Sequence, residues 1–157
     1  MKSTAKFLTG ITLVVVALVA YYILSSQLSV FLDVRVQPAT QNTEAFLKIS
    51  DEVAQGKHEG VYSLKPMEAY SFVTVTAEIK NYSPFPAEWT QLVLKTENGD
   101  LLTVSSDAGP KDIPALKEGT VSLTILTESK EPNRGGWLEY YIFGRSHSIE
   151  VFPETAK

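Results

Sequence analysis

The sequence predicts an all-β domain preceded by a single membrane-spanning helix. From Val30 onward, short runs that alternate apolar and polar residues recur, separated by turn-forming residues. An uncharged apolar run occupies residues 7–24. The chain has 157 residues, which is enough for one domain with some residues left over. About seven strands fit after the apolar run, which is typical of a β-sandwich.

The apolar run, Phe7–Leu24, reads FLTGITLVVVALVAYYIL. As a helix with a rise of about 1.5 Å per residue, roughly 18 residues reach about 27 Å, close to the hydrocarbon thickness of a bilayer. Lys2 and Lys6 precede the run and the next basic residue is Arg35, so the positive-inside tendency predicts a cytoplasmic N-terminus. We expect a cytoplasmic stub at residues 1–6, a signal anchor at residues 7–28 and an extracytoplasmic sandwich at residues 29–157.

A cleaved signal peptide is the rival interpretation of the same run. Its apolar region would be about 7–15 residues long and would end at an Ala-x-Ala-like site. The run here is longer, and Leu24-Ser25-Ser26 matches such a site poorly. We therefore favour a retained single-pass anchor in the cell membrane.

Composition narrows the classes of protein. The sequence contains no cysteine, which excludes disulfides, thiolate metal sites and a lipid-modified cysteine. The roughly 125 residues after the run must therefore rely on a hydrophobic core, and that length is sufficient. This part is mildly acidic and has no basic cluster in its sequence. Binding to nucleic acids and attraction to anionic lipid headgroups are both disfavoured.

Each predicted strand has one apolar face. The clearest lies within residues 69–81, where the inward set is Val73, Val75, Ala77 and Ile79. Residues 31–36 alternate in the same way, with Leu32, Val34 and Val36 on one face and Pro38 ending the strand. Further strands are predicted at residues 89–96, with Leu92 and Leu94 inward, and at residues 101–104, 121–125, 137–145 and 148–152.

Residues 43–64 have two possible structures. Phe46, Ile49 and Val53 have helical spacing, and Asn42 or Thr43 could cap the helix. Ala45, Leu47 and Ile49 have strand spacing instead. We favour a short helix or an irregular segment.

Two turns punctuate the strands. Asn98-Gly99 lies between apolar runs and favours a type I′ turn, so residues 101–104 are expected to pair with the strand before them as a hairpin. Asn81 is expected to end the preceding strand because its amide can bond nearby backbone. Pro84 and Pro86 then stop the pairing, since proline cannot donate to a strand ladder.

The order of these parts resembles that of a known group of domains. FVTVTAEIKN, TQLVLK, an Asn-Gly-Asp turn and Leu-Lys-Glu-Gly follow one another over residues 71–127. This order is similar to that of the telokin-like, immunoglobulin-like extracellular domains of Gram-positive envelope proteins. It also resembles the family named for a Phe-x-Leu-Tyr-Asp motif, of which the stretch Leu92–Thr96 keeps only the central Leu. The resemblance implies an immunoglobulin-like sandwich that serves as an envelope-facing binding or scaffolding module.

Signals of catalysis are weak. His58-Glu59-Gly60-Val61-Tyr62 begins like a zinc-protease helix, but tyrosine stands where the second histidine is required. Ser146-His147-Ser148 places hydroxyls beside an imidazole, but neighbours on a strand point to opposite faces. We expect no enzyme activity, no cofactor, no metal and no small-molecule substrate.

The aromatic residues are the candidate binding residues. Trp137, Tyr141 and Phe143 share one face of a predicted strand, while Leu138, Tyr140 and Ile142 share the face assigned to the core. The first face is either covered by residues 43–64 or exposed to a partner.

Tyr82 and Phe85 pose the same choice at the end of the sandwich. They either pack over the core or form a binding loop.

We therefore expect a membrane-anchored scaffolding module of the bacterial cell envelope, which contacts another envelope protein or a wall polymer. Contact would come through a strand edge or the aromatic face. The alternative is a subunit that assembles through its membrane helix, with the sandwich as a spacer. Gly10, Ala17 and Ala20 are small residues that could permit such helix packing.

Overall fold

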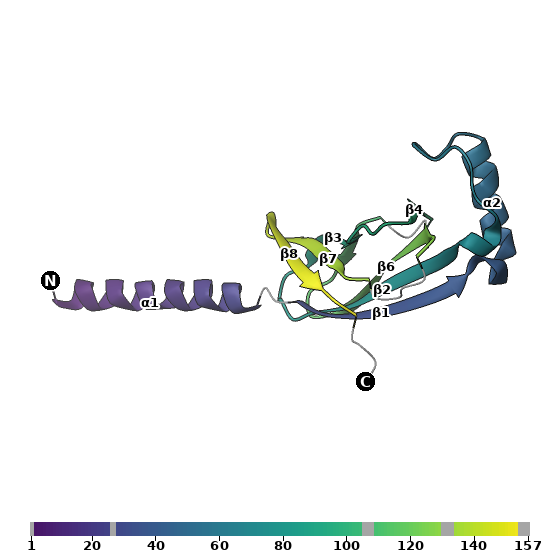
Figure 1. Cartoon of the computed structure of the whole chain (residues 1–157). Coiled ribbons are helices and arrows are strands. Elements are labelled where there is room, and N and C mark those ends of the chain that lie inside the picture. Colours follow the sequence, from purple (N-terminus) through teal and green to yellow (C-terminus); the bar gives the residue numbers. More distant parts are fainter. Residues whose placement is uncertain (1, 26–27, 105–108, 130–133, 154–157) are drawn as a thin grey trace.

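The computed structural model describes residues 2–25, 28–104, 109–129 and 134–153. This part of the chain is mostly β-structure, in two antiparallel sheets, with two α-helices (Figure 1). The strands are β1 (Leu28–Pro38), β2 (Ser71–Asn81), β3 (Ala87–Leu94), β4 (Asp100–Thr103), β5 (Lys111–Ile113), β6 (Glu118–Thr127), β7 (Gly136–Ile142) and β8 (Arg145–Val151). The helices are α1 (Lys2–Ser25) and α2 (Thr43–Ala54), with 3-10 turns η1 (Ala39–Gln41) and η2 (Met67–Ala69).

The two sheets have four strands each. Their orders are β1-β2-β6-β4 and β5-β3-β7-β8, and every pairing is antiparallel. One hydrophobic core lies between the sheets and draws side chains from both, among them Val75, Val121, Leu92, Leu138 and Ile142. The described residues thus form one more strand than about seven, because β5 lies in a stretch that was expected to be a connection.

The alternation of apolar and polar residues in the central strand β2 determines which of its two faces points into the core. Val73, Val75, Ala77 and Ile79 are each at most 1% exposed, as the sequence predicted. Leu32 is buried on the neighbouring strand β1, and β1 ends at Pro38 as expected. Proline has no N–H to donate to the ladder, which accounts for the end of the strand.

The segment between β1 and β2 contains α2, so the helical interpretation of residues 43–64 is confirmed. Phe46, Ile49 and Val53 face inward, and the Asn42 side chain makes no capping hydrogen bond. These residues pack with Tyr70 and Leu126 in a second, smaller core at one end of the domain. α2 therefore packs at one end of the β1-β2-β6-β4 sheet, the end that is farther from α1 (Figure 1).

The turn at Asn98-Gly99 is present, but the predicted hairpin is wrong. Asp100 N donates to Glu97 O at 3.2 Å, and of the two central residues only Gly99 has a positive φ, of 99°. This is the pattern of a type II turn, not type I′. The strand that follows, β4, pairs with β6 in the opposite sheet instead of with β3.

Hydrogen bonds explain where β4 goes. Gly99 O accepts from Glu128 N at 2.8 Å and from Thr127 Oγ1 at 3.1 Å, so the turn is fastened to the end of β6. The two-residue turn with positive φ at both positions lies elsewhere, at Phe143 (51°) and Gly144 (67°), and joins β7 to β8.

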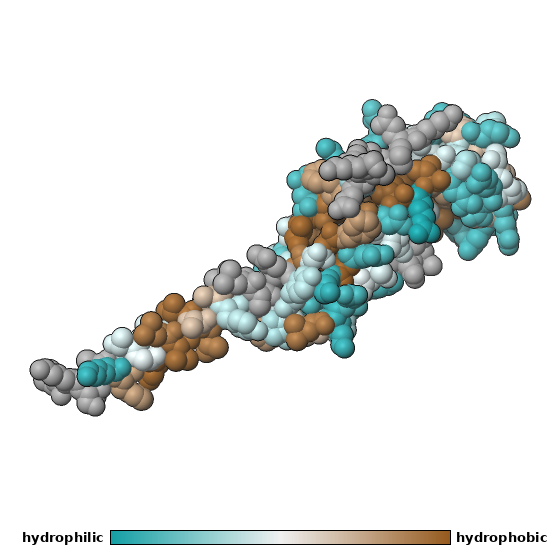
Figure 2. All heavy atoms as spheres, turned by 90° about the horizontal axis from the view of Figure 1, so that it is seen from below, coloured by the Kyte–Doolittle hydropathy of each residue, from teal (hydrophilic) through white to brown (hydrophobic). Residues whose placement is uncertain are grey.

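The uncharged run near the N-terminus is helical, as α1. The figures show α1 extending away from the sheets, with apolar side chains along it (Figures 1 and 2). In residues 6–21 every side chain is exposed. Among the described residues, no helix meets the combined length and hydropathy that a membrane span requires.

Replacing Gly99 by valine tests the turn. We expect Gly99→Val to lower the free energy of unfolding by about 1 kcal/mol or more, because a β-branched residue resists positive φ. A Cβ would also stand 3.4 Å from Glu128 Cβ and from Ser129 N. Gly109→Val is the matched control, since a Cβ there meets nothing within 4 Å. Equal urea midpoints for the two variants would contradict this account of the turn.

Candidate functional site

The five aromatic candidates lie in two separate places. Trp137 and Tyr141 are on the outer face of β7. Tyr82, Phe85 and Phe143 lie in loops at the end of the domain where β1 begins. Phe143 is in the β7–β8 turn, so it does not share a strand face with Trp137 and Tyr141 as expected from the sequence.

The outer face of β7 is exposed. Trp137 and Tyr141 are 37% and 44% accessible, whereas Leu138, Tyr140 and Ile142 are at most 3% accessible. The assignment of the core face is therefore confirmed. The expected cover by residues 43–64 is wrong, because α2 packs in the second core, on Tyr70 and Leu126.

Polar groups surround these two aromatic side chains. Gln91 Nε2 donates to Glu139 Oε2 at 2.8 Å, between the two aromatic side chains. Val93 on β3 is paired with Trp137 and adds an apolar neighbour. Ser148 pairs with Glu139 from β8. We call this surface the β7 face: Gln91, Val93, Trp137, Glu139, Tyr141 and Ser148. It combines apolar area with hydrogen-bonding groups, as protein-binding surfaces do.

A polar hollow of about 290 Å³ adjoins the β7 face and includes Ser146, His147 and Ser148. The His147 ring stacks on the Tyr140 ring at 5.1 Å between centroids. Burial raises the pKa of the Tyr140 phenol above its ordinary value. The imidazole thus lies with the inward-facing Tyr140, on the side of the strand away from the two serine hydroxyls.

Asn81 organises the loops at the end where β1 begins. Its buried Nδ2 donates to Phe85 O at 2.9 Å and to Ile113 O and Pro114 O, both at 3.2 Å. Its Oδ1 accepts from Ser83 N at 2.8 Å. Asn81 therefore ends β2 through its own amide, as predicted, and also ties the β2–β3 loop to the β5–β6 turn.

The same end of the domain carries a group of exposed apolar side chains. Tyr82, Leu116 and Phe143 are 53%, 68% and 63% accessible. Phe85 is half-buried against the main core, and its ring meets that of Phe143 edge-on at 4.1 Å. We call these four residues the end patch. Of the two expectations for this loop, packing over the core holds for Phe85, while Tyr82 is exposed.

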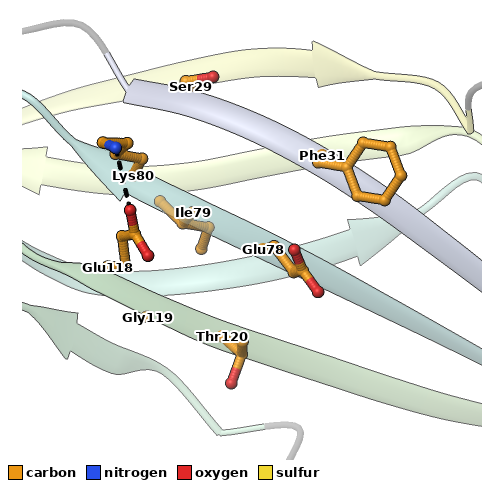
Figure 3. Close-up of a pocket in the computed structure, with 8 residues that line it drawn as sticks. All are labelled: Ser29, Phe31, Glu78, Ile79, Lys80, Glu118, Gly119 and Thr120. Atoms are coloured by element: carbon orange, nitrogen blue, oxygen red, sulfur yellow. Dashed lines mark ion pairs between the residues drawn. The ribbon is translucent and has the colours of Figure 1, made fainter.

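A shallow hollow of about 440 Å³ lies on the outer face of β1, β2 and β6 (Figure 3). Phe31 forms one side of it, and the Lys80–Glu118 ion pair, at 3.0 Å, lies at another. The hydrogen bond that Lys80 donates to the Glu118 carboxylate, together with the negative charge of that carboxylate, raises the pKa of the Lys80 ammonium.

At the opposite end of the sandwich, Arg134 is completely buried. Its Nη1 donates to Asp100 Oδ2 at 2.8 Å, and its Nη2 lies 2.7 Å from Asp100 Oδ1. Nη2 also donates to Thr127 Oγ1 at 3.3 Å. This paired arrangement fixes the β6–β7 connection to the start of β4.

The described residues contain no group of three or more His, Cys, Asp or Glu side chains arranged to hold a metal ion. His58 Nε2 lies 3.3 Å from Glu52 Oε2, at the end of α2. Gly60, two residues after His58, has a φ of 80°. A right-handed α-helix requires a negative φ, so the helix of the zinc-protease pattern is not formed there.

Comparison of the chain with protein-family models, with curated proteins and with solved structures finds no match. What the fold and these surfaces define is a small two-sheet β domain with an apolar helix before it. Its exposed aromatic residues lie at the β7 face and the end patch.

Sequence reasoning missed two of the residues that shape these sites. Leu116 was noted only as part of the stretch before a strand, and its left-handed φ of 57° gives no signal in an Ala-Leu-Lys-Glu context. Arg134 stood in a polar loop, where an exposed side chain is the ordinary expectation. The acidic turn Glu97–Asp100 was the signal that could have suggested its partner.

Substitution of Asn81 tests its role in the loops. Asn81→Ala leaves three carbonyls and one N–H without their partner, so we expect unfolding free energy to fall by about 3 kcal/mol. Asn81→Asp keeps the size and the acceptor but removes the donors, and should destabilise at least as much. The exposed Asn98→Ala is the control. A harmless Asn81→Asp, measured by chemical denaturation, would show that the three carbonyl bonds contribute little.

Removing the Arg134 side chain should destabilise the domain, because the carboxylate of Asp100 is then left buried without its partner. We expect Arg134→Met to lower the unfolding free energy by about 3 kcal/mol or more. Adding Asp100→Asn to it should recover part of that loss, and a double-mutant cycle measures the coupling. Arg35→Met removes an exposed ion pair with Asp33 and should change stability by less than about 1 kcal/mol. Equal losses for Arg134→Met and Arg35→Met would contradict the burial argument.

Proposed function

We propose that this chain is a membrane-anchored binding or scaffolding module of the bacterial cell envelope, which holds another envelope protein against its β7 face. One observation carries the proposal. Trp137 and Tyr141 are exposed on a strand whose opposite face is buried, and their neighbours Gln91, Glu139 and Ser148 supply hydrogen-bonding groups. Large, rigid aromatic side chains with such neighbours are favoured in protein interfaces.

The proposed class is an immunoglobulin-like sandwich. In the constant-type immunoglobulin sandwich, strands A, B, E and D form one sheet and C, F and G form the other. If β5 is left aside, the present strands taken in chain order have the same arrangement: β1-β2-β6-β4 and β3-β7-β8. This order supports the resemblance to telokin-like envelope domains. In this scheme the β7 face is the outer face of the C-F-G sheet.

The anchor is part of the proposal and rests on the whole uncharged run Phe7–Leu24. Its length in sequence matches the hydrocarbon thickness of a bilayer. A helix that is apolar all round needs an apolar environment, and the side chains of residues 6–21 are exposed on every side. Lys2 and Lys6 favour a cytoplasmic N-terminus, so in the proposed topology the domain lies outside the cell membrane.

Binding is favoured over catalysis because of the chemistry of the described surfaces. The β7 face brings together aromatic rings, an amide, a carboxylate and a hydroxyl, with the carboxylate of Glu139 already bonded to Gln91. The hollow on the outer face of β1 and β2 holds an exposed ion pair. Neither arrangement places a nucleophile beside a base within hydrogen-bonding reach.

Tyr141→Ala is the direct test. The side chain is exposed, so we expect the free energy of unfolding to change by about 0.5 kcal/mol or less. Capture of the partner by crosslinking in intact cells should fall sharply, because the variant loses one of the two aromatic contacts of the β7 face. Both measurements are made on the full-length chain, and crosslinked products are identified by mass spectrometry.

Tyr62→Ala is the matched control, since Tyr62 is 90% exposed and lies in the segment after α2. It should leave both stability and capture unchanged. A folded Tyr141→Ala protein that captures the same partner as well as the parent would refute the β7 face as the site. Exchange of residues 7–24 for an unrelated membrane helix separates the alternative, assembly through the helix, because only that alternative predicts loss of capture.

A further inference from the structure

We propose that the end patch docks on the surface of an anionic lipid bilayer, the same bilayer that holds α1. This inference rests on the proposed anchor and adds a second membrane contact to it. Three loop tips form the docking surface: the β2–β3 loop, the β5–β6 turn and the β7–β8 turn.

A hydrogen bond and a ring contact bring the three tips together. Leu116 N donates to Ser83 O at 3.1 Å, which joins the β5–β6 turn to the β2–β3 loop. The Phe85 and Phe143 rings meet at 4.1 Å, which joins the same loop to the β7–β8 turn. Phe85 is half-buried against the main core, so the end patch is packed onto the rest of the domain.

Each tip carries an exposed apolar side chain and a basic one. Tyr82 lies beneath Lys80, whose Nζ is 5.5 Å from the ring centroid. Leu116 is followed by Lys117, and Phe143 is followed two residues later by Arg145; both basic side chains are exposed. Aromatic and apolar groups at the headgroup level, with Lys and Arg beside them, are typical of interfacial membrane contacts.

The backbone provides an independent observation. Leu116 and Phe143 have φ values of 57° and 51°, a region that bulky residues rarely occupy. Position 143 belongs to a two-residue hairpin turn in which Asn, Asp or Gly is the usual choice. Two strained positions each present a large apolar side chain to solvent, which is unfavourable for the isolated domain. Such strain often marks a functional contact.

The length of the chain places this patch near the proposed anchor. Four residues lead from Leu24 to Leu28, and an extended chain covers at most about 14 Å over that distance. Leu28 pairs with Asn81, next to Tyr82. If residues 7–24 span a bilayer, the end patch therefore lies close to the lipid headgroups.

The basic side chains at this end suit a bilayer that carries negative charge. The chain as a whole has a formal charge of −4, yet Lys80, Lys117 and Arg145 gather at this end. Glu118 forms an ion pair with Lys80 at this end, and the acidic side chains of Glu88 and Asp112 are exposed on the adjoining strands β3 and β5. The absence of a basic cluster in the sequence predicted no attraction to anionic lipid headgroups, but the fold brings these three basic residues, which are far apart along the chain, to one end. Tethering by α1 makes even a weak contact effective, since docking becomes intramolecular.

The test uses the absence of cysteine in the chain. Single cysteines are introduced into the full-length protein as Leu116→Cys, Phe143→Cys or Tyr62→Cys and labelled with an environment-sensitive fluorophore. Each protein is reconstituted into vesicles of phosphatidylcholine with or without phosphatidylglycerol. We expect labels at positions 116 and 143 to shift to the blue in anionic vesicles, and the label at position 62 to stay aqueous.

Charge is tested on the same labelled proteins. Lys117→Gln and Arg145→Gln should each lower the ratio of docked to undocked label about fivefold. This factor corresponds to the attraction of about 1 kcal/mol between one basic residue and an anionic membrane surface. Equal docking of the parent in vesicles with and without phosphatidylglycerol would overturn the role of charge.

A label at Val15→Cys reports on the anchor separately. If it enters the hydrocarbon while labels at positions 116 and 143 remain aqueous, docking is refuted and the anchor stands. If the label at position 15 remains aqueous, the anchor is refuted. In that event, blue-shifted tips with anionic vesicles would still support docking, and aqueous tips would refute it as well.

Discussion

One buried side-chain amide decides how the two sheets meet at the end where β1 begins. Asn81 gives its two N–H bonds to carbonyls of the β2–β3 loop and of the β5–β6 connection, and its oxygen takes the N–H of Ser83. The positions of Tyr82, Phe85 and Leu116 all follow from those bonds. An apolar residue would fill the space but would leave the loops without partners, so the geometry of that end depends on one asparagine.

Arg134 has the corresponding role at the other end. There a guanidinium, not an amide, ties the segment that leads into β7 to the β1-β2-β6-β4 sheet, through Asp100 on β4 and Thr127 on β6. The aliphatic core between the sheets specifies which faces point inward, but many combinations of similar volume could fill it. The buried polar groups are more demanding, because each must find a partner. The two ends of this domain are thus specified by hydrogen bonds, and the middle by hydrophobic burial.

Period-two alternation made the strands and their inward faces predictable, as Val73–Ile79 and Leu138–Ile142 illustrate. Helical spacing likewise identified α2. Partners distant in sequence were harder: Asn98-Gly99 indicated a turn, but bonds to Thr127 and Glu128 send β4 to the other sheet. For the candidate site, the exposure of Trp137 and Tyr141 was one of two stated alternatives. The end patch could not be foreseen as a unit, because its residues come from three loops that only the folded chain joins.

The position of α2 has a consequence for the route by which the chain folds. β1 and β2 pair along their whole length, from Pro38–Ser71 to Leu28–Asn81, although residues 39–70 separate them. Closing a longer loop adds only about 0.6 kcal/mol of entropy cost per doubling, and the small core around α2 already draws Ala39 toward Tyr70. The loop closed at Pro38–Ser71 is the shortest that this strand pair can close, so its entropy cost is slightly lower than at Leu28–Asn81.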